Sequence, residues 1–248
     1  MLGSSDSVSE ANVVLNTSVA EELRQFADEL EKADDFEVSL HSLIKRVISQ
    51  HKRIIFNGNG YDEAWLFEAE KRGLLNLRTT PDCLPCLIKK KNIELFTSHK
   101  VYSAEELHAR YEILTENYTK IIGIETLTML DMVNKDILPS VARFSGELAD
   151  EALAKKSLLP SADCRYEETL VRELSELSGA VFAKKNELEE LVAAESDCPD
   201  NTSAAIFCKE KLIPCMTELR ILVDEIETKT DASFWPYPSY GETLFSVK

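Results

Sequence analysis

The chain has 248 residues, of which 44% are hydrophobic and 29% are charged, so it can bury a sizeable core and has the composition of a soluble globular protein. Its formal charge of −16 at pH 7 argues against a basic nucleic-acid-binding face and against docking on an anionic membrane. No apolar run approaches the roughly 20 residues of a spanning helix, and the N-terminus lacks the pattern of a secretory signal. We therefore expect a cytoplasmic or organellar protein, not secreted, without nucleic acid or membrane as partners.

The six cysteines and four histidines show little of the spacing that metal or redox sites need. Cys83 and Cys86 form a Cys-Leu-Pro-Cys sequence, which would suit a redox pair or half of a zinc site. The other half is missing, because Cys208 and Cys215 are seven residues apart and the histidines show no ligand spacing. We expect free thiols in a reducing compartment, and no metal site in this chain.

Two amphipathic helices are predicted near the N-terminus, the first from about residue 12 to the aspartates at 34–35 and the second over about 37–51. Apolar residues at helical spacing in the first helix are Leu15, Val19, Leu23, Phe26 and Leu30. The corresponding residues in the second helix are Leu40, Leu43, Ile44, Val47 and Ile48. Each set forms one face, which we expect to be buried.

Residues 53–61 interrupt this helical pattern. Residues 54–56 (Ile-Ile-Phe) are the best candidate for a short strand or extended segment, and the Asn-Gly-Asn-Gly sequence at 57–60 predicts a tight turn with positive φ. The motif is not a dinucleotide-binding fingerprint, because no third glycine follows at the required offset and no βαβ unit surrounds it. In isolation, the motif indicates a turn and nothing more.

Short helices follow, separated by recognisable start and stop signals. Asp62 and Glu63 suit the positive end of one helix dipole, and Gly73 suits the C-terminal cap of the same helix. Pro81 fits the first turn of the next helix, over about 81–88. A further short helix is expected at about 93–96.

The longest helix is predicted to begin at a capping box, Ser103-Ala-Glu-Glu106. Its apolar seam consists of Leu107, Tyr111, Leu114, Tyr118 and Ile121. Glu125 falls on the continuation of this seam, which leaves two alternatives open. Either Glu125 is a buried functional carboxylate, or the helix rotates so that Ile122, Met129 and Met132 take over the buried face.

Pro139 is expected to kink or end that helix, although the helical pattern resumes over 141–153. Beyond a connection at 158–164, two long segments carry facing apolar stripes and are joined by a polar turn at 197–203. This arrangement predicts an antiparallel helical hairpin. Pro214 should bend the second helix near its start.

The last segment, 234–248, combines several aromatic residues with two prolines, so no helix is expected there. We expect it to pack on the body of the protein or on a partner, because Tyr and Trp supply large contact areas with one polar atom each. Recognition by a polyproline-binding groove is the alternative. The candidate assembly residues are Trp235, Tyr237, Tyr240 and Phe245.

Several collinear blocks resemble the C-terminal part of type III glutamine synthetase, the long form of that enzyme. The blocks are Met1-Leu-Gly-Ser-Ser5 with Val14-Leu-Asn-Thr17, Lys52-Arg-Ile-Ile-Phe-Asn-Gly-Asn-Gly-Tyr61 with Trp65, Glu68-Ala-Glu-Lys-Arg-Gly-Leu-Leu-Asn-Leu-Arg-Thr-Thr80, Glu106-Leu-His-Ala-Arg-Tyr111, and Trp235-Pro-Tyr-Pro with Tyr240-Gly. The resemblance implies a mainly α fold in three parts. Residues 1–80 would be the edge of the catalytic domain, with one short strand or extended segment plus a turn. Residues 81–233 would be a helical extension with the long antiparallel hairpin, and 234–248 an aromatic tail.

The resemblance also implies an activity for the intact enzyme. This family makes glutamine from glutamate, ammonia and ATP through a γ-glutamyl phosphate, with Mg²⁺ or Mn²⁺ held by carboxylates. In the family these sites precede the Gly-Ser-Ser segment, so Met1 resembles an internal methionine of a longer protein. We therefore expect the chain alone to be inactive and to bind no cofactor itself. Its expected role is folding and assembly, as a homo-oligomer or with full-length synthetase subunits.

No residue of the chain matches a catalytic or metal-binding position of that family. The positions expected to support the active site from nearby are Ser4, Ser5, Asn12, Asn57, Gly58, Asn59, Gly60 and Tyr61. One departure is the loss of a Gly-Pro turn before Asn12, which puts the geometry there in doubt. Two other functions stay open: a non-enzymatic helical assembly or interaction module, and a thiol-redox protein whose Cys83 and Cys86 would need a lowered thiol pKa.

Overall fold

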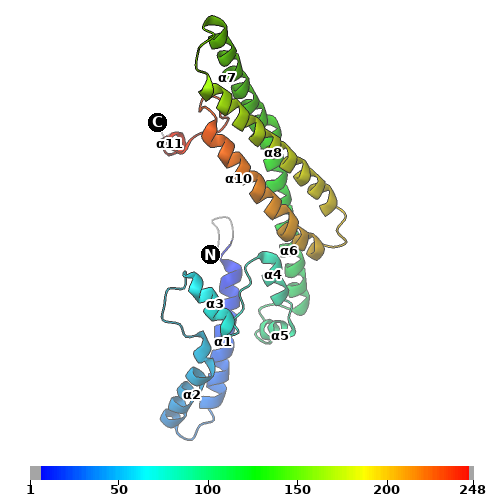
Figure 1. Cartoon of the computed structure of the whole chain (residues 1–248). Coiled ribbons are helices and arrows are strands. Elements are labelled where there is room, and N and C mark those ends of the chain that lie inside the picture. The colour runs from blue at the N-terminus through cyan, green and yellow to red at the C-terminus, as the bar shows by residue number, and fades with distance from the viewer. Residues whose placement is uncertain (1–6, 246–248) are drawn as a thin grey trace. The chain divides into compact units, whose positions relative to one another are not determined.

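The computed structural model describes residues 7–245, and the regular structure in that range is entirely helical (Figure 1). The chain divides into two compact units, residues 1–114 and 115–248. The mainly α fold expected from the sequence is confirmed. Of the two alternatives for residues 54–56, the strand is wrong, and the extended segment holds from Ile55 onward. Helix α2 instead passes into a 3₁₀ turn, η1 (Lys52–Ile54), and Ile55 follows with extended φ and ψ of −81° and 116°. Among residues 7–245 there is no strand for this run to pair with, so it forms no ladder of inter-strand hydrogen bonds.

The first unit contains short helices and one long helix. They are α1 (Ser9–Leu30), α2 (Phe36–His51), α3 (Glu63–Lys71), α4 (Thr80–Cys83), the 3₁₀ turn η2 (Leu84–Cys86), α5 (Lys90–Ser98) and the start of α6 (Ala104–Met132). Helix α1 packs against α2 and α5. Side chains join these helices as well: Arg46 forms an ion pair with Glu29 at 2.6 Å, and His99 Nε2 forms a hydrogen bond with Glu21 Oε2 at 2.8 Å.

The helix ends in this unit follow the capping signals of the sequence. The Asp35 and Asp62 side chains accept hydrogen bonds from the backbone N–H groups of the first turns of α2 and α3. Gly73 has a φ of +70°, as a C-terminal cap requires. The predicted capping box is confirmed, because Glu106 N–H donates to Ser103 Oγ and Ser103 N–H donates to Glu106 Oε2.

The sequence predicted that the apolar stripe of α1 would be buried, but the structure leaves most of this stripe exposed. Leu15, Val19 and Leu23 are 62%, 56% and 61% exposed, while Phe26 and Leu30 are half-buried. On α2, Leu43 is buried but Ile44 and Ile48 are about half exposed. Periodicity identifies an apolar face, but it does not identify what covers that face. Within the described residues of this unit, the face of α1 is open.

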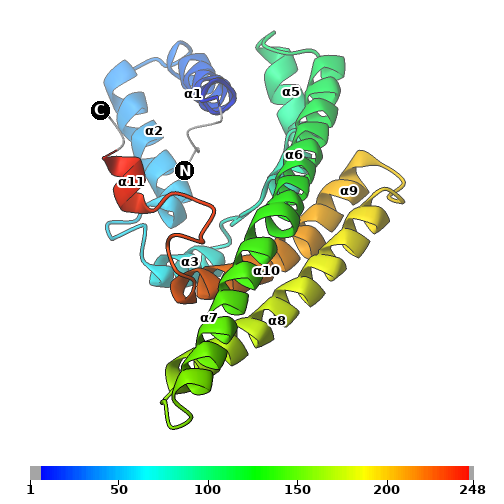
Figure 2. The ribbon, with the colours of Figure 1, turned by 90° about the horizontal axis from the view of Figure 1, so that it is seen from above.

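The second unit is a bundle of long antiparallel helices (Figures 1 and 2). Its elements are the remainder of α6, the π turn η3 (Val133–Ile137), α7 (Leu138–Leu158), α8 (Arg165–Glu195), α9 (Asn201–Phe207), the π turn η4 (Cys208–Leu212) and α10 (Ile213–Lys229). Helix α8 packs against both α7 and α10, which confirms the predicted hairpin. The core is continuous, and fully buried members include Leu174, Val181, Leu188, Leu219 and Ile226.

Neither Pro139 nor Pro214 ends its helix; each follows a π turn. Leu138 N–H bonds Val133 O, and Ile213 N–H bonds Cys208 O. In a regular α-helix a proline ring clashes with the carbonyl four residues earlier, and the wider turn before each proline accommodates that ring. The chain therefore stays helical from Ala104 to Leu158.

The aromatic tail begins by packing on its own unit. Phe234 stacks at an angle on Phe144, with ring centroids 5.3 Å apart, and Trp235 and Tyr237 also contact the core. The expectation of no helix in this segment is wrong, because Tyr240–Leu244 forms the short helix α11. Both prolines lie before this helix, and a capping box of Ser239 and Glu242 starts it.

Candidate functional site

The loop at 55–62 is held by a single arginine at the end of α3. Arg72 Nη1 donates hydrogen bonds to the carbonyl oxygens of Arg53 at 3.2 Å and Ile55 at 3.0 Å. Its Nε donates to Glu68 Oε1 at 2.6 Å, one helical turn earlier. A guanidinium presents several donors in a fixed plane, so one side chain can hold a carboxylate and two carbonyls at once. Arg72 therefore attaches the start of the loop to helix α3.

Two aromatic rings complete this attachment. Phe56 and Trp65 stack with centroids 4.0 Å apart and an interplanar angle of 24°. The Arg72 guanidinium carbon lies 5.6 Å from the Trp65 ring centroid and 6.0 Å from that of Phe56, within the range of a cation–π interaction. We name these three residues the arginine clamp. The clamp fixes the two ends of the loop while the loop itself stays exposed.

The glycines in this loop serve a different purpose from the one predicted. Gly73 is the glycine with positive φ in the described chain, so the expected positive φ at Gly58 and Gly60 is wrong. At Gly58 an added Cβ would lie 2.4 Å from the Phe56 ring, so a side chain would displace this ring of the clamp. At Gly60 the equivalent space is open. Gly58 is thus required for close approach and not for backbone conformation.

The rest of the loop turns through asparagine. Asn59 Oδ1 accepts a hydrogen bond from Tyr61 N–H at 3.1 Å, and Asn59 O accepts one from Asp62 N–H at 3.2 Å. The Tyr61 side chain is 97% exposed, and Asn57 is exposed as well. The structure therefore places residues 57–61 in one exposed loop. Asn12 lies exposed in the first turns of α1, whereas Ser4 and Ser5 lie outside the described residues.

Sequence reasoning missed Arg72, the residue that organises this loop. Its signal was present in the spacing, because Glu68 and Arg72 are separated by one helical turn and Trp65 and Arg72 by two. Such spacing places all three on one face of α3. The loop that precedes α3 could then have been expected to supply the hydrogen-bond acceptors for Arg72.

The metal that the resemblance implies would need a cluster of carboxylate ligands. Among residues 7–245, no three His, Cys, Asp or Glu side chains gather closely enough to hold a metal ion. The described part of the chain therefore has no fitting ligand set for Mg²⁺ or Mn²⁺, and no step of phosphoryl transfer is assigned to it.

None of the described helices is both long enough and apolar enough to cross a bilayer.

The cysteine pair and Glu125 can also be placed. Cys83 lies at the end of α4 and is exposed as a residue. Partial desolvation of its thiol by the surrounding protein, followed by the nearby Cys86, raises the pKa of this thiol. A redox-active thiol requires the opposite shift. Glu125 is exposed, while Ile122 and Met129 pack on the core, so the rotated-helix alternative is correct.

The two units define a class of protein: a helical domain that carries a clamped, glycine-containing loop. The family described as the glutamine synthetase C-terminal domain matches residues 39–176. The chain belongs to that family.

Individual glutamine synthetases match over a wider range. A glutamine synthetase from Butyrivibrio fibrisolvens is 37% identical over 215 residues, which cover 87% of this chain and 31% of that protein. A type-3 glutamine synthetase from Dictyostelium discoideum is 32% identical over 251 residues, with coverages of 98% and 34%. A glutamine synthetase from Bacteroides fragilis (strain YCH46) is 24% identical over 254 residues, with coverages of 98% and 35%. The chain thus spans about a third of the length of the curated relatives it matches.

Proposed function

We propose that this chain is the C-terminal portion of a type-3 glutamine synthetase, an ATP-dependent glutamate–ammonia ligase when intact, and that it contributes folding and assembly. The observation that carries the proposal is the similarity to a type-3 enzyme over 98% of this chain but only 34% of that protein. In this proposal the remaining two thirds supply the carboxylates that hold Mg²⁺ or Mn²⁺, and the site for ATP. The chain alone then forms no glutamine.

The open face of α1 supports this division of roles. Leu15, Val19 and Leu23 lie on one side of the helix and are each more than half exposed. Full burial of such a side chain contributes about 1.5–3 kcal/mol, so covering all three would strongly favour association. The remaining part of the synthetase is the partner we propose for this face.

The arginine clamp has a matching role in the proposal. The clamp fixes both ends of the loop and leaves residues 57–61 exposed. This loop belongs to the same unit as the open face of α1. A loop held in this way can support a neighbouring active site without contributing a catalytic group. Asn57, Gly58, Asn59, Gly60 and Tyr61 are therefore proposed as supporting residues.

A second candidate function is a non-enzymatic assembly module that joins homologous or full-length synthetase subunits. The observation in its favour is the exposed end of the tail. Tyr240, Leu244 and Phe245 are 88%, 69% and 83% exposed around the pre-formed helix α11. Trp235 and Tyr237, in contrast, pack on their own unit. Assembly through the tail should therefore depend on Tyr240 and Phe245 more than on Trp235 and Tyr237.

The proposed function can be tested by exchange. A chimera would carry this chain in place of the matching C-terminal third of the Butyrivibrio fibrisolvens enzyme, in a bacterial strain that cannot make glutamine. We expect the chimera to restore growth without glutamine and the chain alone to give no growth. The double substitution Leu15→Glu and Leu23→Glu should abolish growth with the chimera, because it places charges on the face that needs covering.

The control for this exchange uses another exposed apolar pair. Leu153 and Leu158 on α7 are 68% and 89% exposed, and the double change Leu153→Glu and Leu158→Glu should leave growth intact. A folded chimera without activity would contradict the proposal. Growth supported by a chimera without residues 240–248, but not by the α1 variant, would assign the role to α1 and count against the assembly module.

A further inference from the structure

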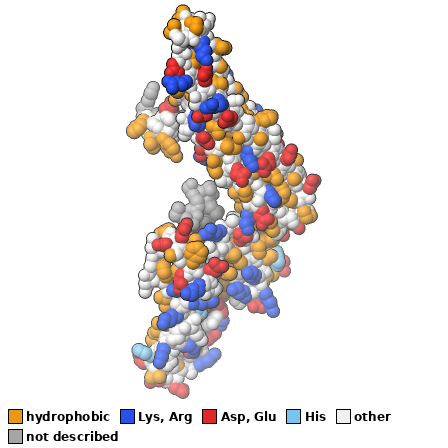
Figure 3. All heavy atoms as spheres, viewed as in Figure 1, with side chains coloured by type: hydrophobic (Ala, Val, Ile, Leu, Met, Phe, Trp, Pro, Cys, Tyr) orange, Lys and Arg blue, Asp and Glu red, His pale blue; other side chains and the backbone are white. Residues whose placement is uncertain are grey.

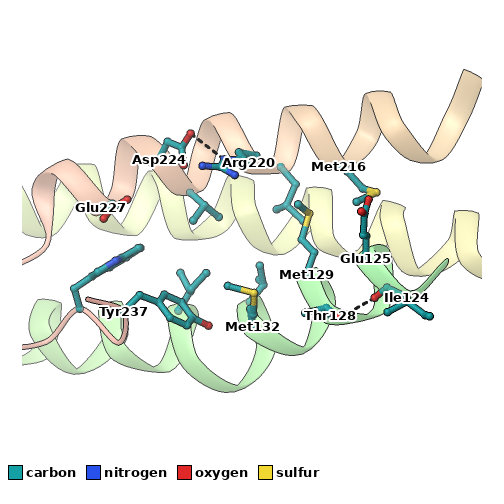
Figure 4. A pocket seen from close by; sticks show the side chains of 15 residues that line it. Ile124, Glu125, Thr128, Met129, Met132, Met216, Arg220, Asp224, Glu227 and Tyr237 are labelled. Atoms are coloured by element: carbon teal, nitrogen blue, oxygen red, sulfur yellow. Dashed lines mark hydrogen bonds and ion pairs between the residues drawn. The ribbon is translucent and has the colours of Figure 1, made fainter. Parts of the chain in front are cut away.

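The second unit contains a groove that the proposed function does not use. It lies between α6 and α10, has a volume of about 480 Å³, and is also lined by Trp235 and by Tyr237, which Figure 4 shows toward one end. The centroids of the Trp235 and Tyr237 rings are 6.4 Å apart, and the rings meet edge to face. The Tyr237 hydroxyl donates a hydrogen bond to Asp136 Oδ2 at 2.9 Å. The volume lies within the range of protein ligand sites.

The groove is lined by most of the chain's methionines. Met129 and Met132 point into it from α6 and Met216 from α10, whereas the whole sequence has four methionines (Figure 4). All three are half-buried, and the Met216 sulfur accepts a hydrogen bond from the buried Thr126 hydroxyl at 3.1 Å. Methionine is unbranched and flexible, and surfaces rich in it adapt to differently shaped apolar side chains. We name this surface the methionine groove.

The walls of the methionine groove are acidic. Glu125 stands on the α6 side, and Asp224 and Glu227 stand on the α10 side. Arg220 is the cation among the lining residues, and its Nε donates to Asp224 at 3.3 Å. Residues 115–248 also carry most of the chain's formal charge of −16, and acidic side chains are spread over the face of this unit that Figure 3 shows. An occupant of this groove should therefore carry positive charge on both sides of an apolar stripe.

We propose that the methionine groove binds a basic amphipathic helix of another protein. Its apolar side chains would contact Met129, Met132 and Met216, and its lysines and arginines would face Glu125 on one wall and Glu227 on the other. An amphipathic helix lying in a groove between two helices is a common mode of peptide recognition. The proposal is independent of the function proposed above, because it uses neither α1 nor the arginine clamp.

The test uses the full chain with Trp65→Phe, so that Trp235, which lines the groove, is the single tryptophan. The probe is a short synthetic peptide of leucine and lysine alone, arranged with helical period. We expect a saturable blue shift of Trp235 fluorescence as the peptide excludes water from the indole. A peptide of the same composition in scrambled order should bind roughly tenfold more weakly, because it has no apolar stripe.

Two matched double variants separate groove binding from general attraction. Glu125→Lys with Glu227→Lys reverses both walls and should weaken binding at least tenfold. Glu176→Lys with Glu190→Lys makes the same change of net charge on exposed positions of α8 outside the groove and should leave affinity within about twofold.

Three results would overturn the proposal. The first is equal weakening by both double variants, and the second is equal binding of the scrambled peptide. The third is self-association of the chain that the peptide displaces, because a second copy would then occupy the groove.

Discussion

At the scale of single residues, Arg72 and Gly58 matter because they determine where neighbouring backbone and ring atoms lie. Arg72 holds two carbonyls, one carboxylate and two rings. Gly58 matters because of the Phe56 ring beside it. The turn itself was predictable from its asparagines and glycines, since such residues form turns for local reasons. The clamp was not, because it depends on contacts between residues 17 and 19 positions apart.

We expect Arg72→Lys to loosen the clamp. Lysine keeps the charge but lacks the planar donors, so the bonds to Arg53 O and Ile55 O cannot both be kept with the Glu68 pair. Hydrogen bonds to a charged group contribute about 1.5–3 kcal/mol, which is the expected loss in free energy of unfolding. Chemical denaturation followed through Trp65 fluorescence, in a Trp235→Phe background, measures this loss. Arg165→Lys, on an exposed pair with Asp163, should leave the denaturation midpoint essentially unchanged.

Tyr237 should titrate late. Burial, followed by its hydrogen bond to Asp136, raises the pKa of Tyr237 to about 12. Its neutral form is therefore favoured by folding. The stability it contributes is complete below the ordinary tyrosine pKa of about 10 and is lost as pH rises through about 12. The ultraviolet absorbance of phenolate should show one late-titrating group that is missing in Tyr237→Phe. Loss of a group that titrates near the ordinary pKa would contradict this assignment.

At the scale of elements, the helix caps were predictable from local signals, whereas the path of the chain at its prolines was not. The capping box at Ser103 and the cap at Gly73 are local, and both were predictable. The π turns before Pro139 and Pro214 were not, because a proline in a helical pattern predicts a break equally well. What allows the helix to continue is packing on both sides, as the buried Val133 and Val141 show. That packing depends on residues far apart in the sequence, so the residues around each proline do not predict it.

Ser103→Ala tests the start of α6. The substitution removes the oxygen that accepts from Glu106 N–H at 3.2 Å, so one backbone donor of the first turn loses its partner. We expect a loss of about 1 kcal/mol in free energy of unfolding, with a range of roughly 0.5–2. Ser175→Ala, at an exposed position inside α8, should be neutral or slightly stabilising because alanine is the better helix former. Equal effects of the two changes on the denaturation midpoint would show that the cap contributes nothing.

At the scale of the whole molecule, the two units differ in how completely they bury their apolar faces. Residues 115–248 enclose a continuous core in which Leu174, Leu188 and Leu219 are fully buried. In residues 1–114 the buried apolar side chains are few and scattered, and α1 leaves its stripe open. This difference is consistent with the proposal made above, in which the second unit folds on itself and the α1 face of the first unit is covered by a partner.

The same difference predicts how substitutions affect the isolated chain. Leu219→Ala removes a fully buried side chain and should cost about 2–5 kcal/mol, because the cavity cannot close completely. Leu15→Glu with Leu23→Glu replaces side chains that are already more than half exposed, so stability should change by no more than about 0.5 kcal/mol. The double change should also reduce binding of a dye specific for apolar surfaces. A large loss of stability in that variant would mean that the α1 stripe is covered within the chain, and the interface proposed for it would then be wrong.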